Sequence, residues 1–353
     1  MNNTEFKDIF GHERPKKVIL TLLARERAPH AFLFFGQDGI GKKKMAIAVA
    51  RSILCETGNG CGRCRACTKV NRLTHPDLLV LDKNYMEWAG QVQRKKSQGH
   101  DPERQRSINT IGIDFIRGSD EKKIRGINQE AYKFPNEGKK RIIIIDNAEN
   151  MSEEAANAFL KTLEEPPEFN LFFLISSREN ELPVTIRSRC TRVSFSPLSQ
   201  GEIRKYFSEA LGLEEDRAEL LSYISNGSID NGLFWMEDDN LRMRRRLGDL
   251  VLGKAKGFVD ATMLSEYISS DNRRLSIYIF FLFSLFRDLY LTKNIEGQHM
   301  VINRDFIEIL KGSRYSNAMI IRAIQKIQET ADIIRYNINK WLLFENLILQ
   351  IMR

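Results

Sequence analysis

Residues 36–43 read GQDGIGKK, the spacing of a loop that binds phosphate groups. Gly36, Gly39 and Gly41 let the backbone curl so that its N–H groups face an anion. Lys42 would reach the β- and γ-phosphates of a nucleotide. The loop follows an apolar run and opens a helical pattern, which is the context that such a loop requires. The sequence therefore predicts a pocket for ATP or ADP.

Two positions in this region depart from what ATP hydrolysis requires. The residue after Lys42 should be Ser or Thr, whose hydroxyl holds Mg²⁺, but here it is Lys43, a cation that would repel the metal. An apolar run ends in Asp146, the expected carboxylate on the metal side. A hydrolytic site of this kind has Glu next, to deprotonate the attacking water, and Asn147 cannot accept that proton. We therefore predict a degenerate nucleotide site that has lost efficient hydrolysis.

Four of the five cysteines lie within one short stretch, at Cys55, Cys61, Cys64 and Cys67. Four thiolates at this spacing can close a tetrahedral shell around Zn²⁺, and a closed shell is structural because it leaves no position for water. An iron–sulfur cluster can also use four cysteines, and unligated core cysteines are the third alternative. The basic side chains in this stretch favour an exposed metal loop over a core. Cys190 is isolated and is predicted to be an inert buried thiol.

The first two hundred residues alternate strand-like and helix-like patterns, which is typical of an α/β fold with a parallel sheet. Apolar runs predict five strands, at residues 31–35, 78–81, 141–146, 171–176 and 191–195. Apolar positions three and four apart predict a helix at residues 42–53, directly after the phosphate loop. After residue 197 only helical patterns follow, including predicted helices at residues 201–211, 217–225 and 231–251.

Two basic regions carry no clear motif. Residues 83–107 are polar and weakly patterned, which favours a solvated surface insertion, with a loop that contacts DNA or a partner as the alternative. The second region is an arginine cluster that is more typical of a solvated helix face than of a binding site. It consists of Arg242, Arg244, Arg245 and Arg246.

Composition sets wider limits on function. A net charge of +8 is compatible with nucleic acid, or an assembly that handles it, as a partner. The N-terminal residues lack a secretory pattern, so we expect a cytoplasmic protein. The most membrane-like stretch, residues 277–286, covers about half of a bilayer core, which favours a buried helix and no membrane partner.

Several longer motifs identify a family. They are Phe10-Gly-His, His75-Pro-Asp, EAANAFLKTLEEPP at residues 154–167, LPVTIRSRC at residues 182–190, and Asn337-Ile-Asn followed by leucines near the C-terminus. On these motifs the chain resembles, nearly end to end, the AAA+ clamp-loader family of bacterial DNA polymerase III, and most closely its delta-prime branch. The four-cysteine loop is shared by the gamma and delta-prime branches.

The resemblance implies three domains, whose limits are inferred from changes in the sequence pattern: an α/β AAA+ P-loop core at residues 1–197 with a zinc loop at 55–67, an all-α lid at 198–260 and an all-α collar at 261–353. It implies that Arg189 acts in trans as an arginine finger at the ATP site of a neighbouring subunit. Ser176 or Ser177 would lie at the sensor-1 position.

The resemblance also locates a lid arginine shortly after Ser228, where this chain has Ile229-Asp-Asn. Together with Lys43 and Asn147, this is a third departure from an active site. The sequence therefore favours a non-catalytic, stator-like subunit in DNA replication. The alternatives are an active gamma-type ATPase of the clamp loader and a free-standing zinc-dependent DNA-binding module.

The resemblance implies the partners as well. They are gamma/tau-like ATPase subunits and a delta-like wrench subunit, the sliding clamp indirectly, and primed DNA within the assembly. The chain would not be an enzyme on its own. It would be a subunit of the DNA polymerase III holoenzyme, whose nucleotidyltransferase activity resides in another chain.

Overall fold

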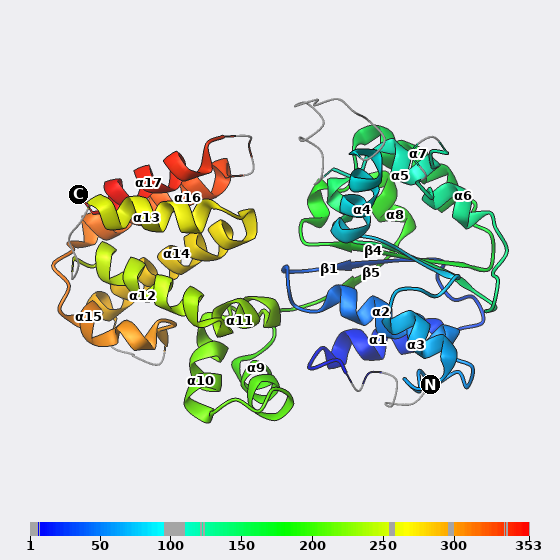
Figure 1. Ribbon diagram of the computed structural model, residues 1–353. Helices are drawn as coiled ribbons and strands as arrows, with labels where there is room; N and C mark the ends of the chain where they lie inside the picture. The colour runs from blue at the N-terminus through cyan, green and yellow to red at the C-terminus, as the bar shows by residue number, and fades with distance from the viewer. Residues whose placement is uncertain are drawn as a thin grey trace. The chain divides into compact units, whose positions relative to one another are not determined.

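The computed structural model describes residues 6, 8–94, 110–120, 122, 124–253, 258–295, 300–334, 336 and 338–352. The chain forms two compact units, Met1–Leu198 and Ser199–Arg353, the first α/β and the second helical (Figure 1). The predicted domain limits at residues 197 and 260 stay predictions.

A parallel sheet of five strands is the centre of the first unit. The strands are β1 (Ala31–Phe35), β2 (Leu78–Leu81), β3 (Arg141–Ile145), β4 (Asn170–Ser176) and β5 (Thr191–Ser194). They lie in the order β2-β3-β4-β1-β5, and each neighbouring pair is parallel. All five predicted strands are confirmed, and each observed end lies within one residue of the predicted end. Every residue of β3 and β4 is buried, as expected for parallel strands covered on both faces.

Helices cover both faces of this sheet (Figure 1). The helices of the first unit are α1 (Glu13–Leu23), α2 (Lys42–Leu54), α3 (Arg65–Asn71), α4 (Lys83–Arg94), α5 (Ile113–Arg117), α6 (Ile127–Ala131), α7 (Glu153–Glu164) and α8 (Val184–Arg189). Phe32 and Phe34 of β1 pack in one core cluster with Met45 of α2. Leu33, between them, packs in a second cluster with Phe159 of α7. The alternation of side chains along β1 thus supplies two cores.

The second unit consists of helices. They are α9 (Gln200–Lys205), α10 (Glu215–Ile224), α11 (Ile229–Met236), α12 (Asp238–Val251), α13 (Phe258–Ser269), α14 (Asn272–Asn294), α15 (Ile307–Lys311), α16 (Asn317–Ile333) and α17 (Lys340–Ile351). A π-helical turn, Tyr206–Ala210, extends α9 to nearly the predicted end of that segment.

The single helix predicted at residues 231–251 is wrong, because the chain forms α11 and α12 there. Glu237 between them has an extended backbone, with φ −69° and ψ 122°. Asp238 and Asp239 then lie in the first turn of α12, where negative charge complements the helix dipole.

The region predicted as an insertion also begins differently from the expectation. Residues 83–94 form helix α4, and Asp82 caps it by accepting a hydrogen bond from the Tyr85 N–H at 2.9 Å. Residues 95–107 of the predicted insertion lie outside the described residues, as does Asn337 of the C-terminal motif.

The arginine cluster divides between surface and core, so its prediction as a solvated helix face is wrong for one member. The Arg244 side chain is 2% exposed and bonds Asp305 and Asn303 at 2.5 and 2.7 Å. Its guanidinium also lies 4.7 Å from the ring centre of Phe281. The other three arginines of the cluster are largely exposed.

Helix α14 contains the stretch that looked most membrane-like in the sequence. By length and composition alone α14 could cross a membrane, but 61% of its apolar window is buried inside the protein. The core helix of a globular unit has the same composition, and α14 packs against α16 and α12. The prediction of a buried helix therefore agrees with the structure.

Candidate functional site

The phosphate loop joins the end of β1 to the start of α2. Gly36, Gly39 and Gly41 have φ of 144°, 72° and 101°, which L-residues with side chains rarely adopt. A Cβ on Gly36 would lie only 2.1 Å from the Phe195 carbonyl oxygen, so no larger residue fits there. His12 bonds the Ile40 carbonyl at 2.7 Å through Nε2 and fixes the far side of the loop. The fold therefore builds the predicted loop at the carboxyl edge of the sheet.

Lys42 is buried within this loop. Its ammonium donates hydrogen bonds to the carbonyl oxygens of Gly36 and Gln37 at 2.8 and 2.6 Å. The side chain thus lies along the inside of the loop that the sequence assigned to phosphate groups.

Lys43 joins the two strand ends next to the loop. Its Nζ lies 2.5 Å from Oδ2 of Asp82 and 3.3 Å from Oδ2 of Asp146. Asp82 follows β2 and Asp146 follows β3, and these strands pair in parallel, so their carboxyl ends meet at one edge. Sequence reasoning missed Asp82, although its place directly after a predicted strand was a usable signal.

Burial and charge act against each other at these three groups. Burial lowers the pKa of Lys43, but Asp146 and Asp82 outweigh it and raise that pKa above its ordinary value. Burial raises the pKa of Asp146, and the ammonium of Lys43 opposes this rise. Lys43 therefore remains a cation at neutral pH, and its charge would repel a Mg²⁺ ion at this place.

The position of the expected catalytic base is occupied by Asn147 in a left-handed backbone conformation, with φ 50°. The nearby Glu149 has a side chain that is 1% exposed. One of its oxygens accepts hydrogen bonds from the N–H and hydroxyl of Ser177, at 3.1 and 2.8 Å. Ser177, one of the two sensor-1 candidates, is thus held by a buried carboxylate.

Arg189 lies at the C-terminal end of α8, and its side chain is 36% exposed. Its Nη2 is 2.7 Å from Oε1 of Glu164 at the end of α7, and its Nη1 donates to the Thr185 carbonyl at 3.0 Å. Sequence reasoning missed Glu164, which lies in the LEEPP motif. The guanidinium is accessible at the surface and is held in one direction.

The segment after Ser228, where the lid arginine was expected, is the first turn of α11. Ser228 caps this helix by accepting a hydrogen bond from the Asn231 N–H at 3.2 Å. Ile229, Asp230 and Asn231 therefore occupy the turn that the family resemblance assigned to a sensor.

The four clustered cysteines bring their sulfur atoms together between α2 and α3. All four Sγ atoms lie within 4.8 Å of one another, with Cys55–Cys64 at 3.9 Å and Cys61–Cys67 at 4.0 Å. Sulfurs around a tetrahedral Zn²⁺ are separated by about 3.8 Å, given a Zn–S bond of about 2.3 Å. The cluster can therefore hold a metal ion of that size.

Backbone hydrogen bonds favour the thiolate form at Cys55 and Cys61 by lowering the pKa of each. Backbone N–H groups of Cys61, Cys64 and Cys67 each point at the sulfur of the preceding cysteine at 3.4 Å. Burial raises the pKa of Cys55, but hydrogen bonds from Thr57 and the backbone outweigh it and lower the pKa to about 5. Burial raises the pKa of Cys67, the most enclosed of the four.

Glycines shape the cysteine loop, and the fifth cysteine lies elsewhere. Gly58, Gly60 and Gly62 have φ between 62° and 74°, as the bends of a metal loop require. Cys190 is buried, and burial raises its pKa to about 12, as expected of an inert thiol.

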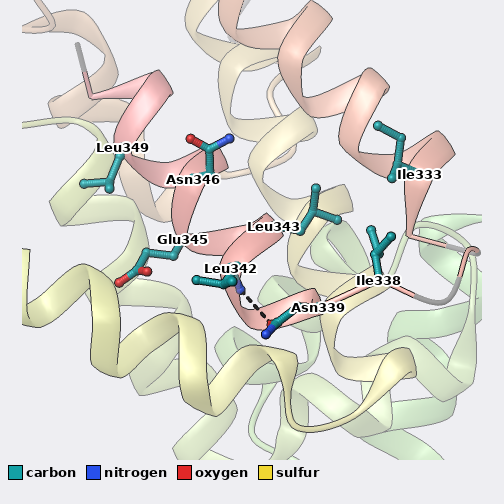
Figure 2. A pocket seen from close by; sticks show the side chains of 8 residues that line it. All are labelled: Ile333, Ile338, Asn339, Leu342, Leu343, Glu345, Asn346 and Leu349. Carbon is teal, nitrogen blue, oxygen red and sulfur yellow. Dashed lines mark hydrogen bonds between the residues drawn. The ribbon is translucent and has the colours of Figure 1, made fainter.

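An apolar groove of about 550 Å³ lies in the second unit, between the end of α16 and α17 (Figure 2). Leu342, Ile333 and Ile338 line it and are 52%, 41% and 36% exposed. Leu343, Leu349, Asn339, Asn346 and Glu345 complete the lining. Glu345 also accepts a hydrogen bond from Thr262 of α13 at 2.6 Å.

The sheet order, the phosphate loop after β1, the four-cysteine cluster and the helical second unit define a P-loop protein of the AAA+ class. The predicted fold class is thereby confirmed. The chain belongs to the DNA polymerase III delta subunit family, whose pattern it matches over residues 11–199. The predicted resemblance to clamp-loader subunits is confirmed with it.

Two relatives represent the two branches that the sequence resembled. The chain is 25% identical over 348 residues to DNA polymerase III subunit delta' of Bacillus subtilis, covering 96% of this chain and 95% of that protein. It is 26% identical over 237 residues to the gamma/tau subunit of Mycoplasma pneumoniae, covering 65% of this chain and 30% of that protein. It spans 30% to 52% of the length of three gamma/tau and tau relatives.

Among solved structures, the chain matches a DNA polymerase III gamma subunit-related protein from Thermotoga maritima, 17% identical, with a TM-score of 0.43. The likeness covers 96% of this chain and 98% of that one.

Proposed function

We propose that this chain is a non-catalytic, delta-prime-like subunit of the clamp loader of DNA polymerase III. Lys43 supports this proposal most directly, because its ammonium lies between Asp82 and Asp146, where a hydrolytic site would hold Mg²⁺. Asn147 lacks the carboxylate that would deprotonate water, and Glu149 is buried and bonded to Ser177. A relative named delta' matches 96% of this chain and is itself covered to 95%, whereas a gamma/tau relative that matches 91% of this chain is covered to 53%.

Within the assembly, Arg189 would act as an arginine finger on a neighbouring gamma/tau-like ATPase subunit. Its accessible guanidinium, held by Glu164, suits this role because stabilising the transition state requires a donor already aimed at the phosphate. ATP binding by the neighbours would open the sliding clamp, and primed DNA would trigger hydrolysis and closure. The chain would also present a rigid face to the delta-like subunit. We place the assembly in the cytoplasm.

The four cysteines would hold a structural Zn²⁺. Four cysteine sulfurs that form a closed shell favour this ion. It would hold the end of α2 against α3 and would take no part in catalysis. The groove beside Leu342 would lie in the collar that joins related subunits.

Steady-state phosphate release by the purified chain, with Mg²⁺ and primed DNA present, tests the catalytic part of this proposal. We expect the rate to equal the background, and the Lys42→Ala variant to show the same rate. Turnover that Lys42→Ala abolishes would establish the alternative, an active gamma-type ATPase, which the gamma/tau relatives keep open.

A further inference from the structure

The contact between Lys43, Asp82 and Asp146 joins three separate elements at the edge where the phosphate loop lies. Lys43 is the second residue of α2, Asp82 follows β2, and Asp146 follows β3. The side chains of Asp82 and Asp146 are 6% and 19% exposed, so water screens their mutual repulsion poorly. Two partly buried carboxylates side by side require a cation, and Lys43 supplies one from within the chain.

We propose that Lys43 is a tethered replacement for a divalent cation: its ammonium occupies the position between Asp82 and Asp146 in which the loop would otherwise hold a metal ion. The proposed function states that hydrolysis is lost, and this inference adds that the metal ion itself is replaced. It rests on the proposed function only for its biological meaning. A phosphate bound to this loop would meet the ammonium groups of Lys42 and Lys43 and no metal ion.

The geometry distinguishes this arrangement from an incidental surface ion pair. A surface pair joins two mobile side chains, whereas Asp82 is fixed by capping α4 through the Tyr85 N–H. Lys43 forms ion pairs with both carboxylates at once, and its side chain is 31% exposed. The carboxylates also present oxygen atoms, the ligands that hard divalent cations prefer. Removing the ammonium should therefore leave a vacant pair of metal ligands.

Mn²⁺ is a suitable probe because it takes the same oxygen ligands and its free form is visible by electron paramagnetic resonance. We would titrate MnCl₂ into the zinc-loaded full chain and into Lys43→Thr, which restores the hydroxyl that such loops carry. Lys43→Thr should bind one Mn²⁺ at least about tenfold more tightly than the unsubstituted chain. The double variant Lys43→Thr/Asp146→Asn should lose this gain. Lys44→Thr, which removes an exposed lysine one residue away, should behave as the unsubstituted chain.

Two results would overturn the inference. One is a Mn²⁺ site in the unsubstituted chain that Asp146→Asn removes, since Lys43 would then not replace the metal. The other is a folded Lys43→Thr chain with no gain in Mn²⁺ binding. Lys43→Gln, which keeps the length of the side chain and removes its charge, provides a second variant, and circular dichroism checks the folding of each.

Thermal unfolding gives an independent readout. MnCl₂ should raise the melting temperature of Lys43→Thr, because a ligand that binds the folded state stabilises it, and should not raise that of Lys44→Thr. Equal shifts in the two variants would contradict the inference. None of these measurements depends on ATP turnover or on Arg189. Failure here would remove the support that Lys43 gives to the proposed loss of hydrolysis, whereas Asn147 and the delta' relative would still support it, and phosphate release tests that proposal separately.

Discussion

Arg189 and Glu164 form a pair at the surface of the first unit, and the pair determines where the guanidinium points. The two side chains are 36% and 47% exposed, so the pair contributes little to stability. Its value is therefore positional. A guanidinium held by a carboxylate at 2.7 Å keeps one orientation until a more strongly charged phosphate competes for it.

The first prediction concerns this arginine in a reconstituted clamp loader. Arg189→Ala should slow ATP hydrolysis at the neighbouring site about 100-fold, because one hydrogen-bond donor to the transition state is lost. The total DNA-stimulated ATPase rate of the assembly should fall by the part that this one site contributes. Arg189→Lys should also be impaired, because lysine lacks the planar fork of donors. Arg192→Ala, which removes another exposed arginine that pairs with Glu179, is the matched control. Unchanged ATPase in Arg189→Ala would rule out the trans role.

The second prediction concerns acid stability and the carboxylate of Glu130, whose side chain is 3% exposed and 3.0 Å from Arg141. Burial raises the pKa of Glu130, but hydrogen bonds from Arg125 and Lys133 outweigh it and lower the pKa from 4.5 to about 2. A lowered pKa stabilises the fold above pH 4.5, and this stabilisation is lost as the pH falls toward 2. The shift corresponds to about 3 kcal/mol at neutral pH.

Glu130→Gln should therefore unfold at lower urea than the unsubstituted chain at pH 7, and the difference should shrink as the pH approaches 2.5. The comparison between the two proteins cancels other acid effects, such as protonation of the cysteines. Glu266→Gln, at an exposed position of α13, should change the unfolding free energy by less than about 0.5 kcal/mol. A difference that stays constant with pH would contradict the assignment.

At the scale of elements, the cysteine loop links α2, which begins at the phosphate loop, to α3. Cys55 ends α2, Cys64 caps α3, and the Sγ of Cys67 approaches the Arg51 carbonyl at 3.9 Å. Few apolar side chains in the connecting loop are available to hold it, so a metal ion would supply much of its order.

The third prediction is that the purified chain contains one zinc ion and that Cys64→Ser contains substantially less. Loss of the ion should open the loop, so trypsin should cut faster after the exposed Arg63 and Arg65. Cys190→Ser removes a thiol far from the cluster in sequence and should keep its zinc. A zinc content well below one ion in the unsubstituted chain would count against the site.

Much of the element structure could be predicted, because local patterns report it directly. The apolar run of β3 identifies a strand buried on both faces, and the glycine spacing identifies the phosphate loop. The break at Glu237 was missed because its neighbours form helix on either side. Arg244 and Arg242 look alike in the sequence, and only packing determines that Arg244 meets Asp305.

The site was predictable in its residue types but not in its pairings. The sequence identified Lys43 as a departure from a metal site and Asp146 as its expected carboxylate. Their contact could not be deduced, because it depends on how β2, β3 and α2 pack together. Asp82 was missed for the same reason, because its place beside Asp146 depends on the pairing of β2 with β3. The partner of Arg189 could not be deduced either, since Glu164 is separated from it by a whole strand.

At the scale of the whole molecule, an α/β unit with an altered phosphate loop is joined to a helical unit with an exposed apolar groove. Lys43 lies between Asp82 and Asp146, and one oxygen of the buried Glu149 accepts hydrogen bonds from Ser177. These contacts support the proposal that the chain keeps the fold of an ATPase and does not hydrolyse ATP. The accessible Arg189 would then be its contribution to chemistry in another subunit.

The last prediction concerns DNA binding by the chain alone, because its net charge is +8. Opposite charges are interspersed, with 54 Lys and Arg against 46 Asp and Glu, and many basic side chains already pair with carboxylates. We therefore expect the isolated chain to bind primed DNA no more tightly than about 10⁻⁴ to 10⁻⁶ M at physiological salt, the range of non-specific binding. Fluorescence anisotropy between 50 and 200 mM salt would measure this, with the reconstituted assembly as the tight-binding control. Tight, salt-sensitive binding by the chain alone, lost when zinc is removed, would instead favour a free-standing DNA-binding module.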